Sequence, residues 1–599
     1  MYISEPVQIL NDVFGYKSFR PLQGEIVEAV ARGEDRLAIM PTGAGKSLCY
    51  QVPALARPGT ALVISPLVAL MQDQVRALRE AGVAAAALTG ATAMDERRDI
   101  WNALEQGTLD LLYVAPERAT MPDFQDRIGR ADLALIAIDE AHCVSEWGHD
   151  FRPDYRQLRP LCDRFPGVPR IGLTATADAM TQADIAQQLG IDADKVVVAG
   201  FDRPNITYHV RAGDSRTRQL MDFLNGRRGR AGIVYAPTRA KVDAIAAQLQ
   251  AAGLNALPYH AGLDAETRSA NQAAFVAGDD MIMVATVAFG MGIDKPDVRF
   301  VAHMALPKSI EAYYQETGRA GRDGAPAEAV MWWGAADIAR ARSQLAEGES
   351  SEERRRIDEG KLNALAAYAA SAACRRIALL TYFGEPAPAP CGNCDNCLEP
   401  PTQVDVSEDA VKLLSAVYRT GQRFGLGHIA DVLGGVASER ASKLGHDRLG
   451  VFGLTEGKTT RDWRPVQQQL VAEDALRVDP QYGGLTLGPA ARAVLKGERT
   501  VSIVPPPPGR KRRRQQGAPA LSDADDPLFG RLRALRKALA AEHGVPAYVI
   551  FHDATLAEVA ARRPATEADL AGISGVGGAK LERYGAAFIT AIADYEAQQ

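Results

Sequence analysis

The chain has 599 residues, of which 47% are apolar and 24% charged, a composition typical of soluble globular proteins with several domains. Its formal net charge of −6 argues against uniform polyanion binding, so any nucleic-acid contact must come from local basic surface. No apolar run approaches the roughly 18 residues that a membrane span needs, and the first residues carry no export signal, which together predict a cytoplasmic protein without membrane contact.

The first candidates for ligand contact lie in a turn near the start of the chain. Residues 7–32 have the pattern of a helix, a turn and a second helix. Gln23 can pair with both the donor and the acceptor on an adenine edge, and Tyr16 or Arg20 can stack on the ring. These residues predict a preference for ATP, with a place in the hydrophobic core as the alternative for Tyr16.

A loop with two glycines follows the apolar run at 37–40 and precedes a helix-like segment. Its backbone N–H groups can turn inward around a phosphate, while Lys46 reaches the β- and γ-phosphates and the Ser47 hydroxyl binds Mg²⁺. The strict pattern has glycine where Met40 stands, so a simple glycine turn is the alternative. The predicted nucleotide contacts of this loop are Thr42, Gly43, Gly45, Lys46 and Ser47.

Two adjacent carboxylates follow the buried-strand run at 133–138. Because ligands bind at the carboxyl ends of parallel strands, Asp139 can hold Mg²⁺ beside Ser47, and Glu140 can orient and deprotonate an attacking water. An acidic pair after a strand is often a solvated loop, but a phosphate loop upstream favours nucleotide hydrolysis. Lys46, Asp139 and Glu140 are therefore the predicted catalytic residues of the first lobe.

An aromatic-rich segment follows directly, over residues 145–155. Gly148 and Pro153 interrupt both helix and strand periodicity, which favours a loop at the cleft over a core segment. Aromatic rings in such a loop suit stacking on the bases of a single strand, and a stacked base could shift the neighbouring carboxylates into hydrolytic position. The predicted DNA contacts of this segment are Trp147, His149, Phe151, Arg152 and Tyr155.

Strand and helix patterns alternate from 60 to 200 and again from 232 to 303, which predicts two doubly wound α/β lobes with parallel sheets. The second lobe has no phosphate loop, so we expect it to supply residues to a shared cleft. Arg319 and Arg322, three apart on one face of a helical turn, can stabilise charge on a transferring phosphoryl group and are predicted to be catalytic. A surface helix with salt bridges is the alternative.

Five segments carry a family resemblance: Phe14–Gln23, Met40–Ser47, Asp139–Tyr155, Val284–Ile293 and Gln315–Arg322. In this order they resemble the bacterial RecQ DNA helicases of superfamily 2, and the stretch from Cys143 to Tyr155 separates that family from RNA-directed members. The resemblance implies two RecA-like lobes and ATP-driven unwinding of DNA from 3′ to 5′. It further implies roles in recombination, repair and the SOS response, contact with the single-stranded DNA-binding protein, and a place at the nucleoid.

Seven cysteines, three of them clustered at 391, 394 and 397, suit a metal site in a reducing compartment better than a disulfide framework. Four thiolates are the tetrahedral set of a structural zinc. Cys374, on a helix-like segment, is weaker by spacing alone, and the family resemblance assigns it as the fourth ligand. The predicted Zn²⁺ ligands are Cys374, Cys391, Cys394 and Cys397.

Residues 405–500 have the pattern of short helices followed by a β-hairpin with Tyr482 near its tip. The resemblance implies a winged helix that grips duplex DNA, with Arg448 as a predicted phosphate contact and plain surface charge as the alternative. A proline- and arginine-rich linker follows. The last module resembles the family's helicase-and-RNase-D C-terminal (HRDC) domain, an auxiliary binder of single strands.

The predicted function is an ATP-dependent DNA helicase that uses ATP, Mg²⁺ and Zn²⁺ and acts on single-stranded and forked duplex DNA. The alternatives are an RNA-directed helicase with the same lobes and a DNA-junction scaffold with weak ATPase activity. The predicted domains are a first RecA-like lobe over 1–202, a second over 203–338, a zinc-binding module over 339–402, a winged helix over 403–502, a flexible basic linker over 503–525 and an HRDC domain over 526–599.

Overall fold

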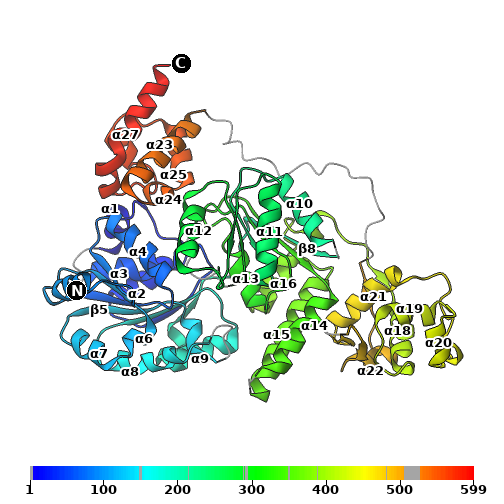
Figure 1. Ribbon diagram of the computed structural model, residues 1–599. Helices are drawn as coiled ribbons and strands as arrows, with labels where there is room; N and C mark the ends of the chain where they lie inside the picture. The colour runs from blue at the N-terminus through cyan, green and yellow to red at the C-terminus, as the bar shows by residue number, and fades with distance from the viewer. Residues whose placement is uncertain are drawn as a thin grey trace.

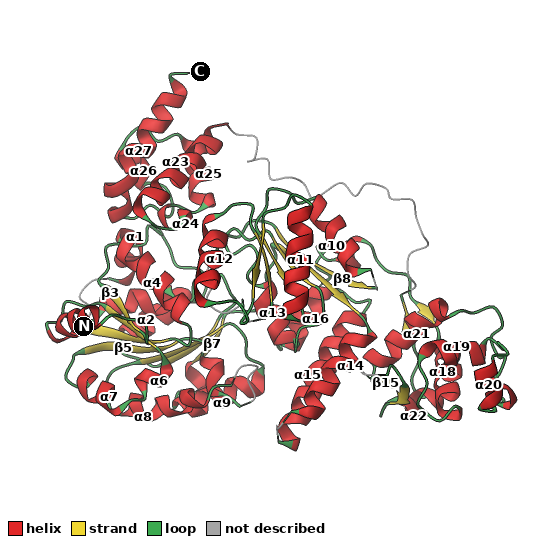
Figure 2. Cartoon of the chain, viewed as in Figure 1, coloured by secondary structure: helices red, strands yellow, loops and turns green. Residues whose placement is uncertain are grey.

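A computed structural model describes residues 5–146, 151–213, 215–287, 289, 295–348, 351–387, 389–479, 482–504 and 527–598. Within these ranges the chain forms two parallel-sheet lobes side by side, a helical extension with a cysteine cluster, a winged helix and a C-terminal helical domain (Figures 1 and 2). The predicted fold class is confirmed.

The first lobe is built on a seven-stranded parallel sheet in the order β3-β4-β2-β5-β6-β1-β7. Only β6 separates β1 from β5, so the loops that leave these two strands open at the same edge. The strands are β1 Arg36–Ile39, β2 Thr60–Ile64, β3 Ala85–Leu88, β4 Leu111–Val114, β5 Leu133–Ile138, β6 Arg170–Thr174 and β7 Val196–Val198.

Helices cover both faces of this sheet, because strand residues are apolar on both sides. Ala38 and Val63 pack in one cluster with α2 to α4, whereas Leu37 and Leu62 pack in another with α5 to α9. The two sets of helices lie on opposite faces of the sheet, as α2 and α4 on one side and α6 to α9 on the other show (Figure 2). The helices are α1 Pro6–Asp12, α2 Gln23–Ala31, α3 Leu48–Ala56, α4 Val68–Glu80, α5 Met94–Glu105, α6 Pro116–Ala119, α7 Pro122–Ile128, α8 Leu158–Asp163 and α9 Ala179–Leu189.

The second lobe has a six-stranded parallel sheet in the order β10-β11-β9-β12-β13-β8. Strand β8 was not anticipated from sequence, although its burial alternates as expected for a strand at the sheet edge. The strands are β8 Ile206–Ala212, β9 Gly232–Tyr235, β10 Ala256–Tyr259, β11 Ile282–Ala285, β12 Phe300–His303 and β13 Ala327–Trp333. The helices are α10 Arg216–Asn225, α11 Arg239–Ala251, α12 Ala265–Ala277 and α13 Ile310–Thr317.

Two helices, α14 Ala335–Glu347 and α15 Glu352–Ala370, lead away from the second lobe, and α16 Arg375–Tyr382 and α17 Asp395–Leu398 return to it. The winged helix follows on the far side of the second lobe (Figure 1). Its hairpin pairs β15 Leu476–Val478 with β16 Leu485–Leu487, and Tyr482 at the turn is 81% exposed, as predicted. Its helices are α18 Ser407–Arg419, α19 Leu426–Leu433, α20 Glu439–Lys443, α21 Thr460–Ala472 and α22 Ala491–Leu495, closed by β14 Val404–Asp405 with β17 Ser502–Ile503.

The C-terminal domain is a bundle with its own apolar core. It lies at the other end of the molecule from the winged helix, against the first lobe beside α1 and α4 (Figure 1). Its helices are α23 Pro527–His543, α24 Ala547–Ile550, α25 Asp553–Arg562, α26 Glu567–Ala571 and α27 Gly578–Glu596.

Candidate active site

The loop between β1 and α3 has the backbone of a phosphate cradle. Gly43 and Gly45 adopt φ angles of +81° and +82°, which side-chain-bearing residues rarely reach. Lys46 and Ser47 then lead directly into α3, so the loop ends at a helix N-terminus. The hydroxyl of Thr42 is buried without a hydrogen-bond partner among the described residues, which leaves a polar atom suited to a ligand.

The polar side chains around the loop are bonded to main-chain carbonyls. Lys46 Nζ donates to the carbonyl oxygens of Met40 (3.1 Å) and Pro41 (3.4 Å). Such carbonyl contacts hold the ammonium over the loop, where it would face a phosphate. When a phosphate binds, Lys46 must give up its hydrogen bonds to these two carbonyls and bond the phosphate oxygens in their place.

Gln23, the first residue of α2, and Arg20, in the turn before that helix, contact the cradle. Gln23 is 2% exposed, and its side-chain amide donates to the carbonyl of Gly45 at 2.8 Å. The Arg20 guanidinium donates to the carbonyl of Gly43. Tyr16 is half-buried in the preceding turn. The structure therefore brings Gln23 and Arg20 to the loop, whereas Tyr16 packs against the apolar cluster of α1 to α3, and contact of the three residues with adenine stays a prediction.

The acidic pair lies at the same sheet edge. Asp139 follows β5, and burial together with the negative charge of Glu140 raises its pKa to about 7, although the Lys46 ammonium acts in the opposite direction. Because β1 and β5 end at the same edge of the sheet, the cradle and the acidic strand end lie in one site.

Glu140 has a strained backbone, with φ of +49° and ψ of +46° in the left-handed region. Its carboxylate lies 3.3 Å from Nδ1 of the fully buried His142, whose ring also bonds the Thr174 hydroxyl at 2.9 Å. A non-glycine residue in this region costs free energy, so surrounding contacts must hold Glu140 there.

Tyr155 is wrongly predicted as a DNA contact. It is fully buried, and its hydroxyl donates to the carbonyl of Asp139 at 2.9 Å. Its ring therefore cannot stack on a base in this arrangement. The aromatic-rich segment is instead hydrogen-bonded to the metal-binding candidate itself.

Other residues of this segment are more exposed. Phe151 and Arg152 are half-buried, and the Arg152 backbone N–H donates to the carbonyl of Cys143 at 2.9 Å. Trp147 and His149 lie outside the described residues. Contact of these four residues with DNA stays a prediction.

The two arginines do not share a helical face as predicted, because α13 ends before Gly318 and both lie in the turns that follow. Arg322 nevertheless faces the cradle: a Cβ added at Gly43 would lie 3.3 Å from its Cα. Arg319 is 6% exposed and lies beside Tyr235 in the second lobe. The phosphate loop and the arginine-bearing turns thus lie against each other at the junction of the two lobes.

Arg203 is a residue that the sequence pattern did not indicate. It lies between the lobes, 8% exposed, and its guanidinium donates to the carbonyls of Thr42 (2.6 Å), Gly318 (3.0 Å) and Ala320 (2.8 Å). It therefore ties the cradle to the arginine-bearing turns. A lone arginine beside the proline at 204 gives no periodic signal. Its position directly after the predicted end of the first lobe at residue 202 is the sequence feature that could have indicated a contact between the lobes.

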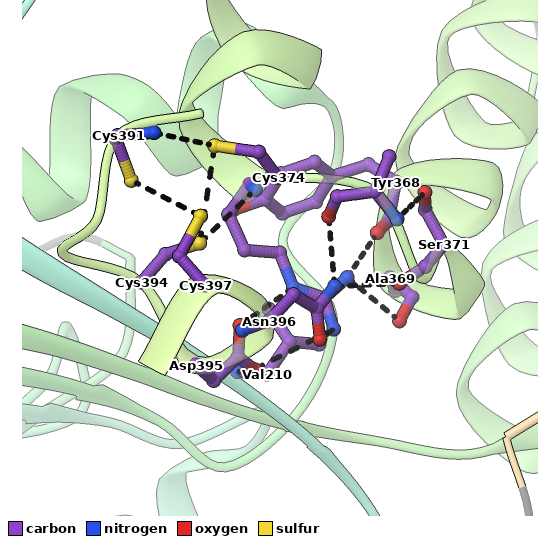
Figure 3. Close-up of polar contacts among 12 residues, drawn as sticks. Val210, Tyr368, Ala369, Ser371, Cys374, Cys391, Cys394, Asp395, Asn396 and Cys397 are labelled. Atoms are coloured by element: carbon purple, nitrogen blue, oxygen red, sulfur yellow. Dashed lines mark hydrogen bonds and ion pairs between the residues drawn. The ribbon is translucent and has the colours of Figure 1, made fainter. Parts of the chain in front are cut away.

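The four predicted zinc ligands converge in space. The sulfur atoms of Cys374, Cys391, Cys394 and Cys397 all lie within 4.8 Å of one another (Figure 3). Cys374 is not inside a helix but occupies the N-cap position of α16, and Cys394 occupies that of α17. Four thiols at this separation match the donor set of a structural zinc.

Backbone N–H groups support the thiolate form. The N–H of Cys391 donates to Sγ of Cys374 and that of Arg375 to Sγ of Cys394, both at 3.4 Å. Although burial opposes ionisation of Cys374, the N–H groups of Ile377 and Cys391 lower its pKa to about 7.

The cluster is fastened to the edge strand of the second lobe. The Asp395 carboxylate accepts the N–H of Val210 on β8 at 2.8 Å and pairs with Arg375 Nε at 3.0 Å, while Arg375 also donates to the carbonyl of Tyr368 (Figure 3). These bonds cover a sheet edge that would otherwise be unpaired.

In the winged helix, Arg448 is exposed at the end of a short turn. Lys443 nearby pairs with Glu439 at 2.6 Å. Contact of Arg448 with phosphate stays a prediction. Among the described residues, no helix combines the length and the apolar character that crossing a membrane requires.

Five family models match the chain in succession. They are the DEAD/DEAH box helicase over residues 20–185, the helicase conserved C-terminal domain over 215–324, RecQ zinc-binding over 335–398, the RQC domain over 400–512 and the HRDC domain over 525–592.

Several curated proteins are similar over almost their whole length. The ATP-dependent DNA helicase RecQ of Pasteurella multocida (strain Pm70) is 44% identical over 593 residues, which cover 98% of this chain and 94% of that protein. The protein of the same name from Bacillus subtilis (strain 168) is 39% identical over 590 residues, covering 98% of each.

Proposed function

The chain belongs to the RecQ family of ATP-dependent DNA helicases, and from this premise we propose that ATP hydrolysis between its two lobes drives 3′ to 5′ movement along single-stranded DNA and separation of the duplex ahead. The observation that carries the proposal is the contact between the lobes, where Arg322 of the second lobe lies against Gly43 of the phosphate loop. A movement of the phosphate loop therefore also moves the segment that carries Arg322.

At this junction, residues of both lobes have separate roles in phosphoryl transfer. Lys46 binds the β- and γ-phosphates, Glu140 orients and deprotonates the attacking water, and Arg322 stabilises the charge that spreads over the γ-phosphoryl oxygens. Ser47 and Asp139 would hold Mg²⁺, which when bound would neutralise phosphate charge. The buried hydroxyl of Thr42 and the positive-φ glycines fit a triphosphate in the loop.

The DNA strand is sensed through the aromatic-rich segment. Phe151, Arg152, Trp147 and His149 are the proposed strand contacts. The Tyr155 hydroxyl, bonded to the Asp139 carbonyl, supplies the link from this segment to the carboxylates. A strand that moves the segment therefore also moves the groups that hold Mg²⁺ and water.

The remaining modules position DNA. Zinc bound by the four cysteines has a structural role, since four thiolates leave no open coordination position. The winged helix, with Arg448, holds the duplex. We further propose a cytoplasmic, nucleoid-associated protein that acts in recombination and repair and contacts the single-stranded DNA-binding protein.

Strand separation on tailed duplexes tests the proposal directly. We expect ATP-dependent unwinding of a duplex with a 3′ single-stranded tail, and little unwinding of the same duplex with a 5′ tail. Stimulation of ATP hydrolysis by DNA but not by RNA of the same sequence would exclude the RNA-directed alternative. DNA binding with neither unwinding nor stimulated hydrolysis would instead support the junction scaffold and contradict the proposal.

A further inference from the structure

The C-terminal domain meets the first lobe along a seam of glycines. A Cβ added at Gly15 would lie 2.6 Å from the carbonyl carbon of Val576, and one added at Gly577 would lie 2.5 Å from the carbonyl oxygen of Val13. Distances this short leave no room for a side chain on either side. The two backbones therefore approach each other as closely as they do only because both segments carry glycine.

The seam encloses the turn that carries Tyr16. The N–H of Gly575 donates to the carbonyl of Gly15 at 2.9 Å, and Lys17 Nζ donates to the carbonyl of Gly572 at 2.7 Å. Both chain neighbours of Tyr16 are thus hydrogen-bonded to the C-terminal domain, more than 550 residues away in sequence. Tyr16 itself belongs to the turn assigned above to the adenine base.

Two further contacts hold the domain in place. On α4 of the first lobe, the Glu80 carboxylate accepts hydrogen bonds from the Arg583 guanidinium and from the Tyr584 hydroxyl, the latter at 2.9 Å. Toward the second lobe, Arg533 forms an ion pair with Asp279 at 3.3 Å. The domain therefore contacts both lobes beside the nucleotide cleft.

We propose that the C-terminal domain is a positioning element of the nucleotide site, because docking fixes the turn on both sides of Tyr16. This inference rests on the proposed role of Tyr16 in binding ATP. Docking and nucleotide binding must then favour each other, since a coupling between two binding events is reciprocal. Residues 575–577 are buried against the first lobe and therefore cannot contact DNA while the domain is docked.

Gly577→Ala in the full-length protein is the test variant. Gly577 has an ordinary φ of −84°, and the atoms nearest its added Cβ all belong to the first lobe, so the substitution acts on the seam and not on the fold of its own domain. Gly578→Ala is the matched control, since its Cβ would make an ordinary 3.5 Å contact with the Asp12 carbonyl oxygen.

The measurement is the Kd of a fluorescent ADP analogue without DNA, together with hydrogen exchange of residues 10–17. If undocking leaves the turn competent in about a tenth of the molecules, Gly577→Ala raises Kd about tenfold, raises KM for ATP and leaves kcat near the wild-type value. Exchange of residues 10–17 should rise in the same variant, and Gly578→Ala should match wild type in every readout. Saturating nucleotide should increase protection of residues 572–584 in the wild-type protein.

A second variant weakens docking of the C-terminal domain at a contact outside the turn, at Glu80 on α4. Glu80→Arg places a positive charge beside Arg583 and should change Kd and exchange in the same direction as Gly577→Ala. Unchanged hydrogen exchange of residues 10–17 in both variants would contradict the claim that the glycine contacts dock the C-terminal domain on this turn. Increased exchange with a wild-type Kd would overturn the positioning role alone.

Tyr16→Ala separates this inference from the proposed function. Weakened nucleotide binding in Tyr16→Ala is expected and supports both. Wild-type affinity in Tyr16→Ala would remove Tyr16 from the nucleotide site, and the positioning inference would fail with it, whereas Lys46 and the phosphate loop would be unaffected.

Discussion

The phosphate loop and the cysteine cluster bind their expected ligands by opposite strategies. Around the loop, main-chain carbonyls accept hydrogen bonds from the side chains of Lys46, Gln23 and Arg20. A nucleotide that binds these side chains must take the place of the carbonyls as their hydrogen-bond partner. In the cluster, four sulfur atoms already converge, and backbone N–H groups point at them. A site that releases its nucleotide in every cycle needs other hydrogen-bond partners for its polar side chains while it is empty. A site that keeps its metal does not, because its ligands can stay around the metal. The predictions below test this difference.

The largest effect should come from Lys46→Ala. Removing the ammonium should abolish ATP hydrolysis, because it removes the positive charge proposed to face the β- and γ-phosphates, while binding to tailed DNA persists. Steady-state ATPase and DNA-binding measurements check this, with Lys195→Ala, on the surface of the same lobe, as the control. DNA-stimulated turnover near the wild-type rate would remove the loop from the chemistry.

Arg322→Ala should lower kcat by about a thousandfold, since its partner is charge that develops only in the transition state. The Kd for ATP should change little by comparison. Single-turnover hydrolysis and equilibrium nucleotide binding separate the two quantities. Equal losses in both would identify Arg322 as a structural residue that holds the lobes together.

The cluster should respond through folding instead of catalysis. We expect one zinc per chain by elemental analysis, and Cys394→Ser should lose the metal and lower the yield of folded protein. Cys162→Ala, which removes a buried thiol far from the cluster in sequence, should keep its zinc. Purified protein without zinc but with normal thermal stability would contradict the structural role.

The smallest effect tests the link between the strand segment and the carboxylates. Tyr155→Phe removes the hydroxyl that donates to the Asp139 carbonyl, a loss of about 1 kcal/mol, so DNA-stimulated turnover should fall about fivefold. Tyr482→Phe, at the exposed hairpin turn, should leave ATPase activity unchanged. Full stimulation in Tyr155→Phe would show that the strand signal takes another route.

Sequence patterns predicted both sites where the chemistry is local. The phosphate loop is one contiguous segment, and three of the four cysteines lie within seven residues, so spacing alone indicates their function. Arg203 could not be predicted in this way, because its role depends on carbonyls brought from both lobes.

The errors have the same physical origin. Arg319 and Arg322 were expected on a helix, but α13 ends at Thr317 and the chain turns toward the cradle. Tyr155 was expected to contact DNA because aromatic residues in a loop suit base stacking, yet the fold buries it, with its hydroxyl bonded to the Asp139 carbonyl. Likewise, only the assembled fold brings Gly15 and Gly577 together.

The most direct test of the account is a crystal structure with Mg²⁺ and a non-hydrolysable ATP analogue. We predict that Lys46 leaves the carbonyls of Met40 and Pro41 for the β- and γ-phosphates and that Arg322 approaches the γ-phosphate, while the four cysteine sulfur atoms stay where they are. A bound analogue with Lys46 still on the Met40 carbonyl, or with Arg322 turned away from the γ-phosphate, would contradict the account.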